Sequence, residues 1–171
     1  MLVINILLDS FGGAEDVARN IFKYNQSRKY KSLIIYLNDT KHLKLTKNEI
    51  LINKFKYSLS LVSYIKTFFV IWKLSKGHSK VILHSHLFPI FYLIPLFKIS
   101  KKFILIHTEH NVNNARREYL LFRKYRIFKK IEKFIYKQYT FLVSVSDDVK
   151  IELQKWLDIK KDNNENLKFI V

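Results

Sequence analysis

The sequence predicts a doubly wound α/β fold, with a mainly parallel sheet and helices on both of its faces. Short apolar runs alternate along the chain with longer segments whose apolar residues recur every three or four positions, as buried parallel strands and amphipathic helices do. Hydrophobic residues make up 49% of the 171 residues, which is enough for a core. With three Gly and two Pro, the chain has little material for a turn-rich all-β fold. We expect one domain, residues 1–171.

The first half of the chain is expected to form four strands and two helices. The expected strands are 2–8, 31–37, 50–55 and 80–84, and the expected helices are 14–27 and 58–76. The first strand ends before a glycine pair, and Gly77 is placed to end the second helix. The first apolar run lacks a basic leader and is interrupted by Asp9, which indicates a buried strand rather than a signal peptide.

The second half continues the same alternation of strands and helices. The expected helices are 87–99, 117–138 and 147–157, and the expected strands are 102–108, 140–145 and 167–171. Acidic residues fill the first turn of the helix at 147–157, where they complement the helix dipole. Because the last strand begins only at Leu167, we expect further chain to follow Val171.

The chain is strongly basic and contains no cysteine. It has 31 Lys and Arg against 14 Asp and Glu, a net charge of +17, which attracts nucleic acid, anionic lipid or nucleotide phosphates. The absence of cysteine excludes disulfides and thiolate metal sites and permits a reducing cytosol. Lysines or prolines interrupt the two most hydrophobic stretches, 57–74 and 87–97, so neither predicts a membrane-spanning helix. We expect a soluble or peripheral protein.

Glycines and polar residues follow four of the expected strands. They are Gly12 and Gly13 after the first, His84 and His86 after the fourth, 107–111 after the fifth, and 144–148 after the sixth. Ligands on parallel sheets bind at the carboxyl ends of the strands, so these positions predict a binding site. The glycine pair allows a close backbone approach and the following helix N-terminus offers N–H donors to an anion, with a plain tight turn as the alternative. The pattern is neither a dinucleotide fingerprint nor a P-loop.

The histidines after the fourth and fifth strands admit several interpretations. In an extended strand, His84 and His86 project to the same side. Either one of the two packs while the other is exposed, or His86 contacts a substrate. A zinc cluster with His107 and His110 is a further alternative. Glu109, His110 and Asn111 are expected at the sheet's rim, in position to contact a ligand; a neutral imidazole can donate to or accept from the hydroxyl groups of a ligand. Alternatively, Asn111 or Asn113 caps the helix that follows.

The expected helix at 117–138 is basic on one side and apolar on the other. Residues 116–137 carry nine Lys or Arg and two Glu, a net charge of +7. Its apolar side is expected to comprise Tyr119, Phe122, Tyr125, Phe128, Ile131 and Ile135. A solvated outer helix, an anionic-membrane surface and a nucleic-acid surface all fit this pattern, and Arg123, Lys124 and Lys130 are the membrane-facing candidates.

Four motifs, taken in order, resemble one known family. Gly-Gly-Ala-Glu at 12–15, His-Ser-His-Leu-Phe at 84–88, Thr-Glu-His-Asn at 108–111 and Val-Ser-Val-Ser-Asp-Asp-Val-Lys at 143–150 are similar to the N-terminal domain of family-4 glycosyltransferases. The resemblance covers residues 2–171. It implies one Rossmann-like half of a GT-B fold, the acceptor-side half, with the C-terminal donor-binding domain absent from this chain.

The resemblance also implies roles for individual residues. Gly12 and Gly13 would lie beside the donor phosphates and acceptor, His110 near the transferring sugar as the catalytic residue, His86 on the acceptor side, and Ser146 at the cleft. Family members often have a basic residue after Gly-Gly-Ala-Glu, where this chain has Asp16. No cofactor or metal is expected, because the chain has no Asp-x-Asp motif and no suitably spaced carboxylate pair; the nucleotide sugar is a substrate.

The function implied is that of half a retaining transferase. The complete enzyme would move a sugar from a nucleotide sugar to a glycan or lipid-linked acceptor in cell-surface polysaccharide biosynthesis, and this chain alone would be inactive. The implied location is cytoplasmic, peripheral on the inner face of the cytoplasmic membrane, with anionic lipid favoured over nucleic acid as the partner of the basic surface. A noncatalytic module that binds nucleic acid or anionic membrane is the alternative.

Overall fold

A computed structural model describes residues 1–8, 12–38, 45–53, 61–86, 92–110, 126–158 and 168–170. Its strands are β1 (Leu2–Leu7), β2 (Lys31–Asn38), β3 (Glu49–Asn53), β4 (Val81–Ser85), β5 (Phe103–Glu109), β6 (Phe141–Ser144) and β7 (Lys168–Ile170). Its helices are α1 (Gly13–Ser27), α2 (Leu61–Leu74), the 3₁₀ helix η2 (Ile94–Ile99), α4 (Arg126–Tyr136) and α5 (Asp147–Leu157). Each expected strand is found, with small shifts at its ends.

The seven strands form one sheet in the order β3-β2-β1-β4-β5-β6-β7, and every neighbouring pair is parallel. The chain builds outward from β1 to β3, then returns to place β4 on the other side of β1. In the register of the central strands, Asn5 of β1 lies opposite His84 of β4, which lies opposite Ile106 of β5. This topology confirms the predicted doubly wound, mainly parallel sheet.

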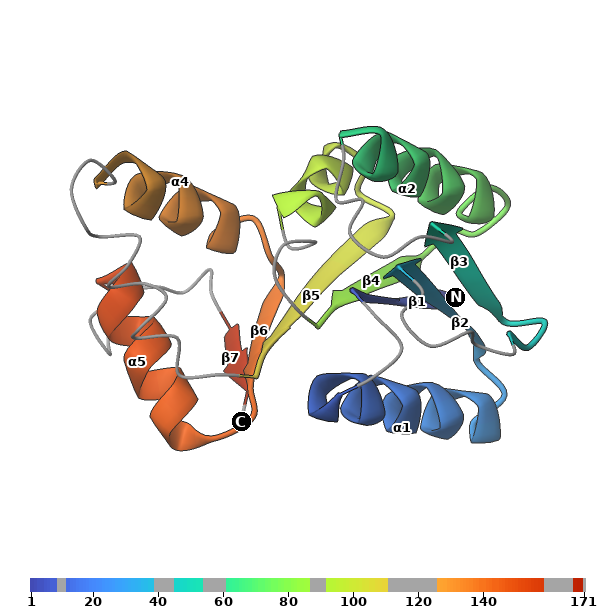
Figure 1. The fold of residues 1–171 in the computed structure, drawn as a ribbon, viewed down its shortest axis with the longest axis horizontal. Helices are drawn as coiled ribbons and strands as arrows, with labels where there is room; N and C mark the ends of the chain where they lie inside the picture. The colour runs from blue at the N-terminus through green and yellow to red at the C-terminus, as the bar shows by residue number, and fades with distance from the viewer. Residues whose placement is uncertain are drawn as a thin grey trace.

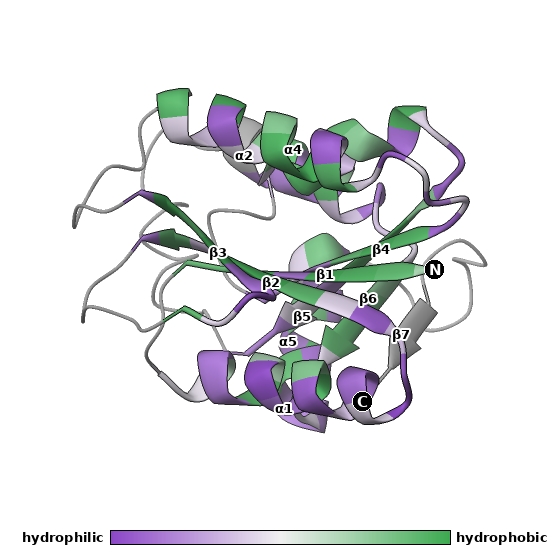
Figure 2. Ribbon diagram, turned by 90° about the vertical axis from the view of Figure 1, so that its right-hand side faces the viewer, coloured by the Kyte–Doolittle hydropathy of each residue, from purple (hydrophilic) through white to green (hydrophobic). Residues whose placement is uncertain are grey.

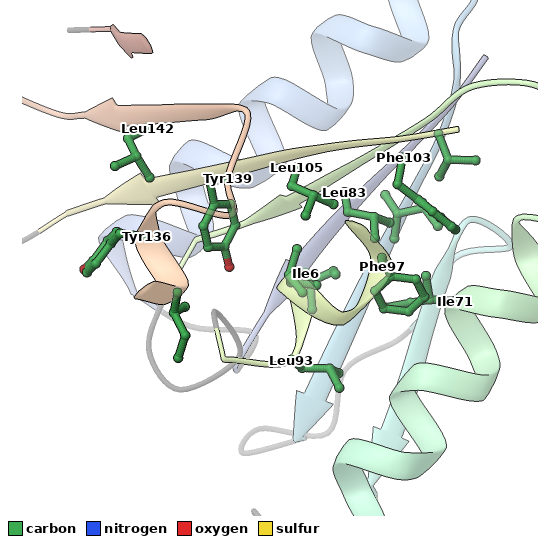
Figure 3. Packing of buried hydrophobic residues seen from close by; sticks show 14 of the residues in the cluster. Ile6, Ile71, Leu83, Leu93, Phe97, Phe103, Leu105, Tyr136, Tyr139 and Leu142 are labelled. Atoms are coloured by element: carbon green, nitrogen blue, oxygen red, sulfur yellow. The ribbon is translucent and has the colours of Figure 1, made fainter. Parts of the chain in front are cut away.

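Helices cover both faces of the sheet, with α2 and α4 on one face and α1 and α5 toward the other (Figures 1 and 2). The larger hydrophobic cluster lies on the α2 side, where Ile6, Leu83 and Leu105 of the sheet meet Ile71 of α2 and Phe97 of η2 (Figure 3). A smaller cluster joins the sheet to α1. Burial of these apolar side chains is the main favourable term for folding.

Two helical predictions require correction. The segment 87–99 was expected to be a short apolar helix; in its described part, the helix is 3₁₀ and covers only Ile94–Ile99, with Pro95 in its first turn. Ile131 of α4 was expected on the buried side, yet its side chain is 44% exposed, whereas Glu132 is buried. Neighbouring helix positions differ by about 100° in direction, so an inward Glu132 turns Ile131 outward.

Helix ends follow the expected chemistry at two places. Gly77 has a positive φ of 76° in the turn that follows α2, a conformation that favours glycine. Ser146 caps α5, because its side-chain oxygen accepts a hydrogen bond from the backbone N–H of Val149 at 3.3 Å. Among the helices of the described ranges, none is long and apolar enough to cross a bilayer.

Candidate functional site

The glycine pair joins the region after β1 to the start of α1. Gly12 has φ 137°, which side chains rarely tolerate, and a Cβ added there would lie 2.5 Å from Oε2 of Glu15. The Glu15 side chain is buried beneath this turn. Gly13 differs, because an added Cβ would meet no heavy atom within 4 Å. Of the two glycines, Gly12 is therefore the one that the backbone conformation requires.

The position after Gly-Gly-Ala-Glu carries an acid that is paired within α1. Asp16 Oδ1 lies 3.2 Å from Nη1 of Arg19, one turn further along the helix. Arg19 Nε also lies 3.4 Å from the hydroxyl of Tyr36, which donates to Glu49 Oε1 at 3.0 Å. The positive charge nearest to this motif is therefore that of Arg19, whose side chain contacts Asp16 and Tyr36.

Three histidines and a threonine lie together on the α1-side face of the sheet, at the carboxyl ends of β4 and β5. The rings of His84 and His86 have centroids 4.0 Å apart, and His84 Nε2 lies 2.7 Å from Oγ1 of Thr108. His110 Nε2 lies 3.5 Å from Nδ1 of His86. The expected same-side placement of His84 and His86 is confirmed. The alternative of one packed and one exposed imidazole is wrong, because both side chains are buried.

Burial makes these imidazoles hard to protonate. Removal from water, followed by the proximity of His107 and His110, lowers the pKa of His84 to about 3. Burial together with the neighbouring histidines also holds the pKa of His86 well below its ordinary value. Half-buried His110 has its pKa lowered chiefly by burial, with Glu109 opposing the shift. At neutral pH the cluster is uncharged, so each ring carries one donor and one acceptor nitrogen.

A second polar group lies on the opposite face of the sheet, against α4. Ser85 Oγ lies 2.9 Å from Nδ1 of His107 and 3.3 Å from the Tyr139 hydroxyl, and His107 Nε2 lies 3.8 Å from Oε2 of Glu109. The hydroxyl of Tyr136 donates to Glu109 Oε2 at 2.6 Å. The chain of contacts from Ser85 through His107 to Glu109 resembles the arrangement of a nucleophile, a base and an acid in hydrolases. Ser85 is fully buried, however, so no substrate carbonyl can reach its hydroxyl. The group ties β4 and β5 to α4.

The structure brings together some of the sequence-predicted site residues and separates others. His86 and His110 meet, whereas Glu109, next to His110 in sequence, projects to the opposite face and is buried against Tyr136. Ser146 follows β6 and caps α5. Lys130 is exposed on α4. Asn111, Arg123 and Lys124 lie outside the described residues, as does the proposed cap at Asn113.

One residue that sequence reasoning missed is Asn5, in the middle of β1. Its side chain is completely buried, and neither its amide nitrogen nor its amide oxygen has a hydrogen-bond partner within the described ranges. It lies beside His84 in the sheet register, and Nε2 of His86 likewise has no partner there. Buried polar atoms are normally hydrogen-bonded, so these atoms need a partner that the described residues do not supply, such as an enclosed water molecule. The signal was a single Asn within an apolar strand.

The metal alternative and the nucleic-acid alternative gain no support from the described residues. Within them, no group of three or more His, Cys, Asp or Glu side chains could hold a metal ion. On the basic helix α4, Lys129 Nζ lies 3.3 Å from Oδ1 of Asp158, and Lys133 pairs with the other carboxylate oxygen of that residue. Part of the positive charge of α4 is therefore neutralised by the end of α5.

Solved structures of low sequence identity share this fold over nearly the whole chain. A glycosyltransferase from Rickettsia africae ESF-5 is 19% identical, with a TM-score of 0.57 over 98% of this chain and 42% of its own. The apo form of the lipopolysaccharide outer core galactosyltransferase WaaB is 16% identical, with a TM-score of 0.59 over 98% of this chain and 44% of its own. An alpha-glucosyltransferase in complex with UDP and a DNA 13-mer containing an HMU base is 12% identical, with a TM-score of 0.57 over 99% and 42%. The chain spans less than half the length of each.

Sequence comparison adds a family assignment. A search of curated proteins finds no match for this chain. A family model described as Glycosyltransferase Family 4 matches residues 11–165, which include the glycine pair, the histidine cluster and the start of α5. The resemblance found in the four sequence motifs is thereby confirmed. The chain belongs to glycosyltransferase family 4.

Proposed function

We propose that this chain is the acceptor-side half of a retaining glycosyltransferase, which acts with a second, donor-binding domain. The complete enzyme transfers a sugar from a nucleotide sugar to a glycan or lipid-linked acceptor in cell-surface polysaccharide synthesis, from a peripheral position on the inner face of the cytoplasmic membrane. Family membership supports the transferase class. The length of the solved structures, more than twice the part that this chain matches, supports the need for a second domain.

The observation that carries the proposal is the contact between His86 and His110 at the carboxyl ends of β4 and β5. Burial keeps both imidazoles neutral, and a neutral ring can hydrogen-bond a sugar hydroxyl as donor or acceptor. His110 is half-buried and His86 is fully buried, so His110 is the residue that contacts substrate, and His86 orients the ring of His110.

Catalysis in this proposal rests on placing the reactants and stabilising the leaving phosphate. The turn at Gly12 leads into the N-terminus of α1, whose free N–H groups attract an anion. Glu109 is not assigned to proton transfer to substrate, because it is buried on the other face and accepts a hydrogen bond from Tyr136. No metal takes part in the proposed mechanism.

The test is a titration of the 171-residue chain with a panel of nucleotide sugars, followed by the NMR signals of the histidine rings. Weak binding should shift the ring signals of His110 and of its neighbour His86, and His110→Ala should abolish the shift of the His86 signals. His78, in the turn after α2, is the matched control, and His78→Ala should respond like the unchanged chain. If His110→Ala and His78→Ala showed equal shifts on addition of nucleotide sugar, the placement of the binding site at His110 would be contradicted. Appreciable sugar transfer by this chain alone would contradict the division into two halves.

A further inference from the structure

Helix α2 exposes several large apolar side chains, although others pack against the core, and its inward face includes two small polar residues. Among its described side chains, the buried ones are Ser63, Thr67 and Ile71. Asn53 donates to Ser63 Oγ at 2.8 Å, and Thr67 Oγ1 donates to the Ser63 carbonyl at 2.8 Å, so these inward hydroxyls are satisfied. Large apolar side chains that face outward are the reverse of what the outer helix of a water-soluble domain normally shows.

The exposed apolar side chains lie along one side of α2 and are also found on the neighbouring helix η2. Val62, Ile65, Phe69 and Trp72 are 57%, 48%, 64% and 42% exposed, and their spacing of three and four residues places them on one side of α2. Phe68 stacks on Phe97 of η2 with ring centroids 4.8 Å apart, which places the two helices side by side. On η2, Leu96 is 54% and Ile99 is 91% exposed.

The charges around this apolar surface have one sign. The chain contains no acidic residue between Glu49 and Glu109, but nine lysines, of which Lys66, Lys73 and Lys98 are exposed on α2 and η2. On α4, which covers the same face of the sheet, the described acidic residue is Glu132, and it is buried. The exposed acids of the described helices lie instead on α1 and α5: Asp16, Asp147 and Asp148 are exposed, Glu152 is half-buried and Glu15 is buried.

We propose that the surface formed by α2 and η2 docks on an anionic lipid bilayer, with α2 lying in the plane of the headgroups. Phe69, Trp72 and Ile99 enter the boundary of the acyl chains, and Lys66, Lys73 and Lys98 contact lipid phosphates. Apolar side chains set among lysines on one helix surface are the pattern of interfacial binding. A second copy of the chain fits this surface poorly, because the same lysines would face one another across a two-fold axis.

The docking surface specifies which part of the chain contacts the membrane at the peripheral location proposed above. It rests on that proposal only for the choice of the cytoplasmic membrane. It also moves the lipid contact from the basic helix α4 to α2 and η2. Binding to vesicles requires no sugar transfer, so a failure of the docking surface and a failure of the transferase assignment give different results. The proposed contact predicts that Trp72, one of two tryptophans in the chain, senses the lipid, because Trp156 is buried.

The experiment is co-sedimentation of the 171-residue chain with vesicles of phosphatidylcholine, alone or mixed with phosphatidylglycerol. Binding is expected for the mixed vesicles, with a blue shift of tryptophan fluorescence that Trp72→Phe removes. The double variant F69S/I99S should lower the partition coefficient by about 10-fold or more, since two large apolar groups no longer enter the membrane. The control Y24S/I151S removes one aromatic and one aliphatic side chain, 57% and 46% exposed, from α1 and α5, and it should bind within about twofold of the unchanged chain.

A second pair of measurements separates the role of charge from that of another copy. K66Q/K73Q should weaken binding to the mixed vesicles by about fivefold for each lysine, and added salt should reduce that difference. Absence of vesicle binding, or equal losses in F69S/I99S and Y24S/I151S, would overturn the proposal. A dimer in analytical ultracentrifugation that F69S/I99S dissociates would also overturn it, by assigning the surface to a second copy.

Discussion

The neutral histidine cluster predicts that the domain loses stability on mild acidification. The folded state depresses the pKa of His84 to about 3 and that of His86 well below its ordinary value, whereas the unfolded chain protonates both near pH 6.5. The unfolded state therefore binds more protons as the pH falls through about 6.5, and stability that is present above this pH is lost below it. His84 should remove about 2 kcal/mol from the free energy of unfolding between about pH 7 and about pH 5, and His86 should add to this loss in the same direction.

Urea denaturation followed by circular dichroism at the two pH values measures this effect. His84→Gln keeps a hydrogen-bonding group toward Thr108 but cannot titrate, so the loss on acidification should shrink by about 2 kcal/mol. His78→Gln is the matched control, since His78 lies outside the buried cluster, is only partly buried, and has its pKa lowered from its ordinary value by slight burial and nearby cations. If His84→Gln and the unchanged chain lost equal stability between the two pH values, the histidine explanation would be refuted.

Three further predictions concern single side chains, each measured by urea denaturation. Gly12→Ala should cost about 1–3 kcal/mol, because the backbone is at φ 137° and the new Cβ meets a carboxylate, while Gly13→Ala should not destabilise, since its Cβ enters open space; equal effects would contradict this. Ser146→Ala should cost about 1 kcal/mol through loss of the cap of α5, with Ser146→Thr expected to retain most of it. Glu132→Leu should cost about 2–3 kcal/mol, because the buried indole N–H of Trp156 and the half-buried hydroxyl of Tyr92 lose their acceptor; no loss would show that water satisfies them.

The strands were predictable from sequence because their signal is local. Buried parallel strands are apolar on both faces, so β1, β2 and β5 appear as short hydrophobic runs whatever the rest of the chain does. Their parallel pairing then brings the residues that follow them to one edge of the sheet. For this reason the contact between His86 and His110 could be anticipated as a shared location, although not as a specific pair of nitrogen atoms.

Helix orientation was less predictable, because it depends on contacts between distant residues. On α4, Glu132 accepts hydrogen bonds from Tyr92 at 3.1 Å and from Trp156 at 2.8 Å, and these partners lie 40 and 24 positions away in sequence. No local sequence pattern predicts that the acidic side chain of Glu132 faces the core. On α2, apolar residues surround nearly the whole helix, so periodicity alone could not reveal that Phe69 would be exposed and Thr67 buried.

The strand order explains how so divergent a sequence can keep the same fold. Because the chain leaves β1 toward β2 but later enters β4 on the other side of β1, the carboxyl ends of β1 and β4 lie where the order of the strands reverses, and ligands of open parallel sheets bind at such a point. The path of the backbone fixes this position, and Asn5 and His84 lie opposite one another in the two strands beside it. Drift to 12–19% identity with the solved structures can therefore change these side chains while the strand order persists.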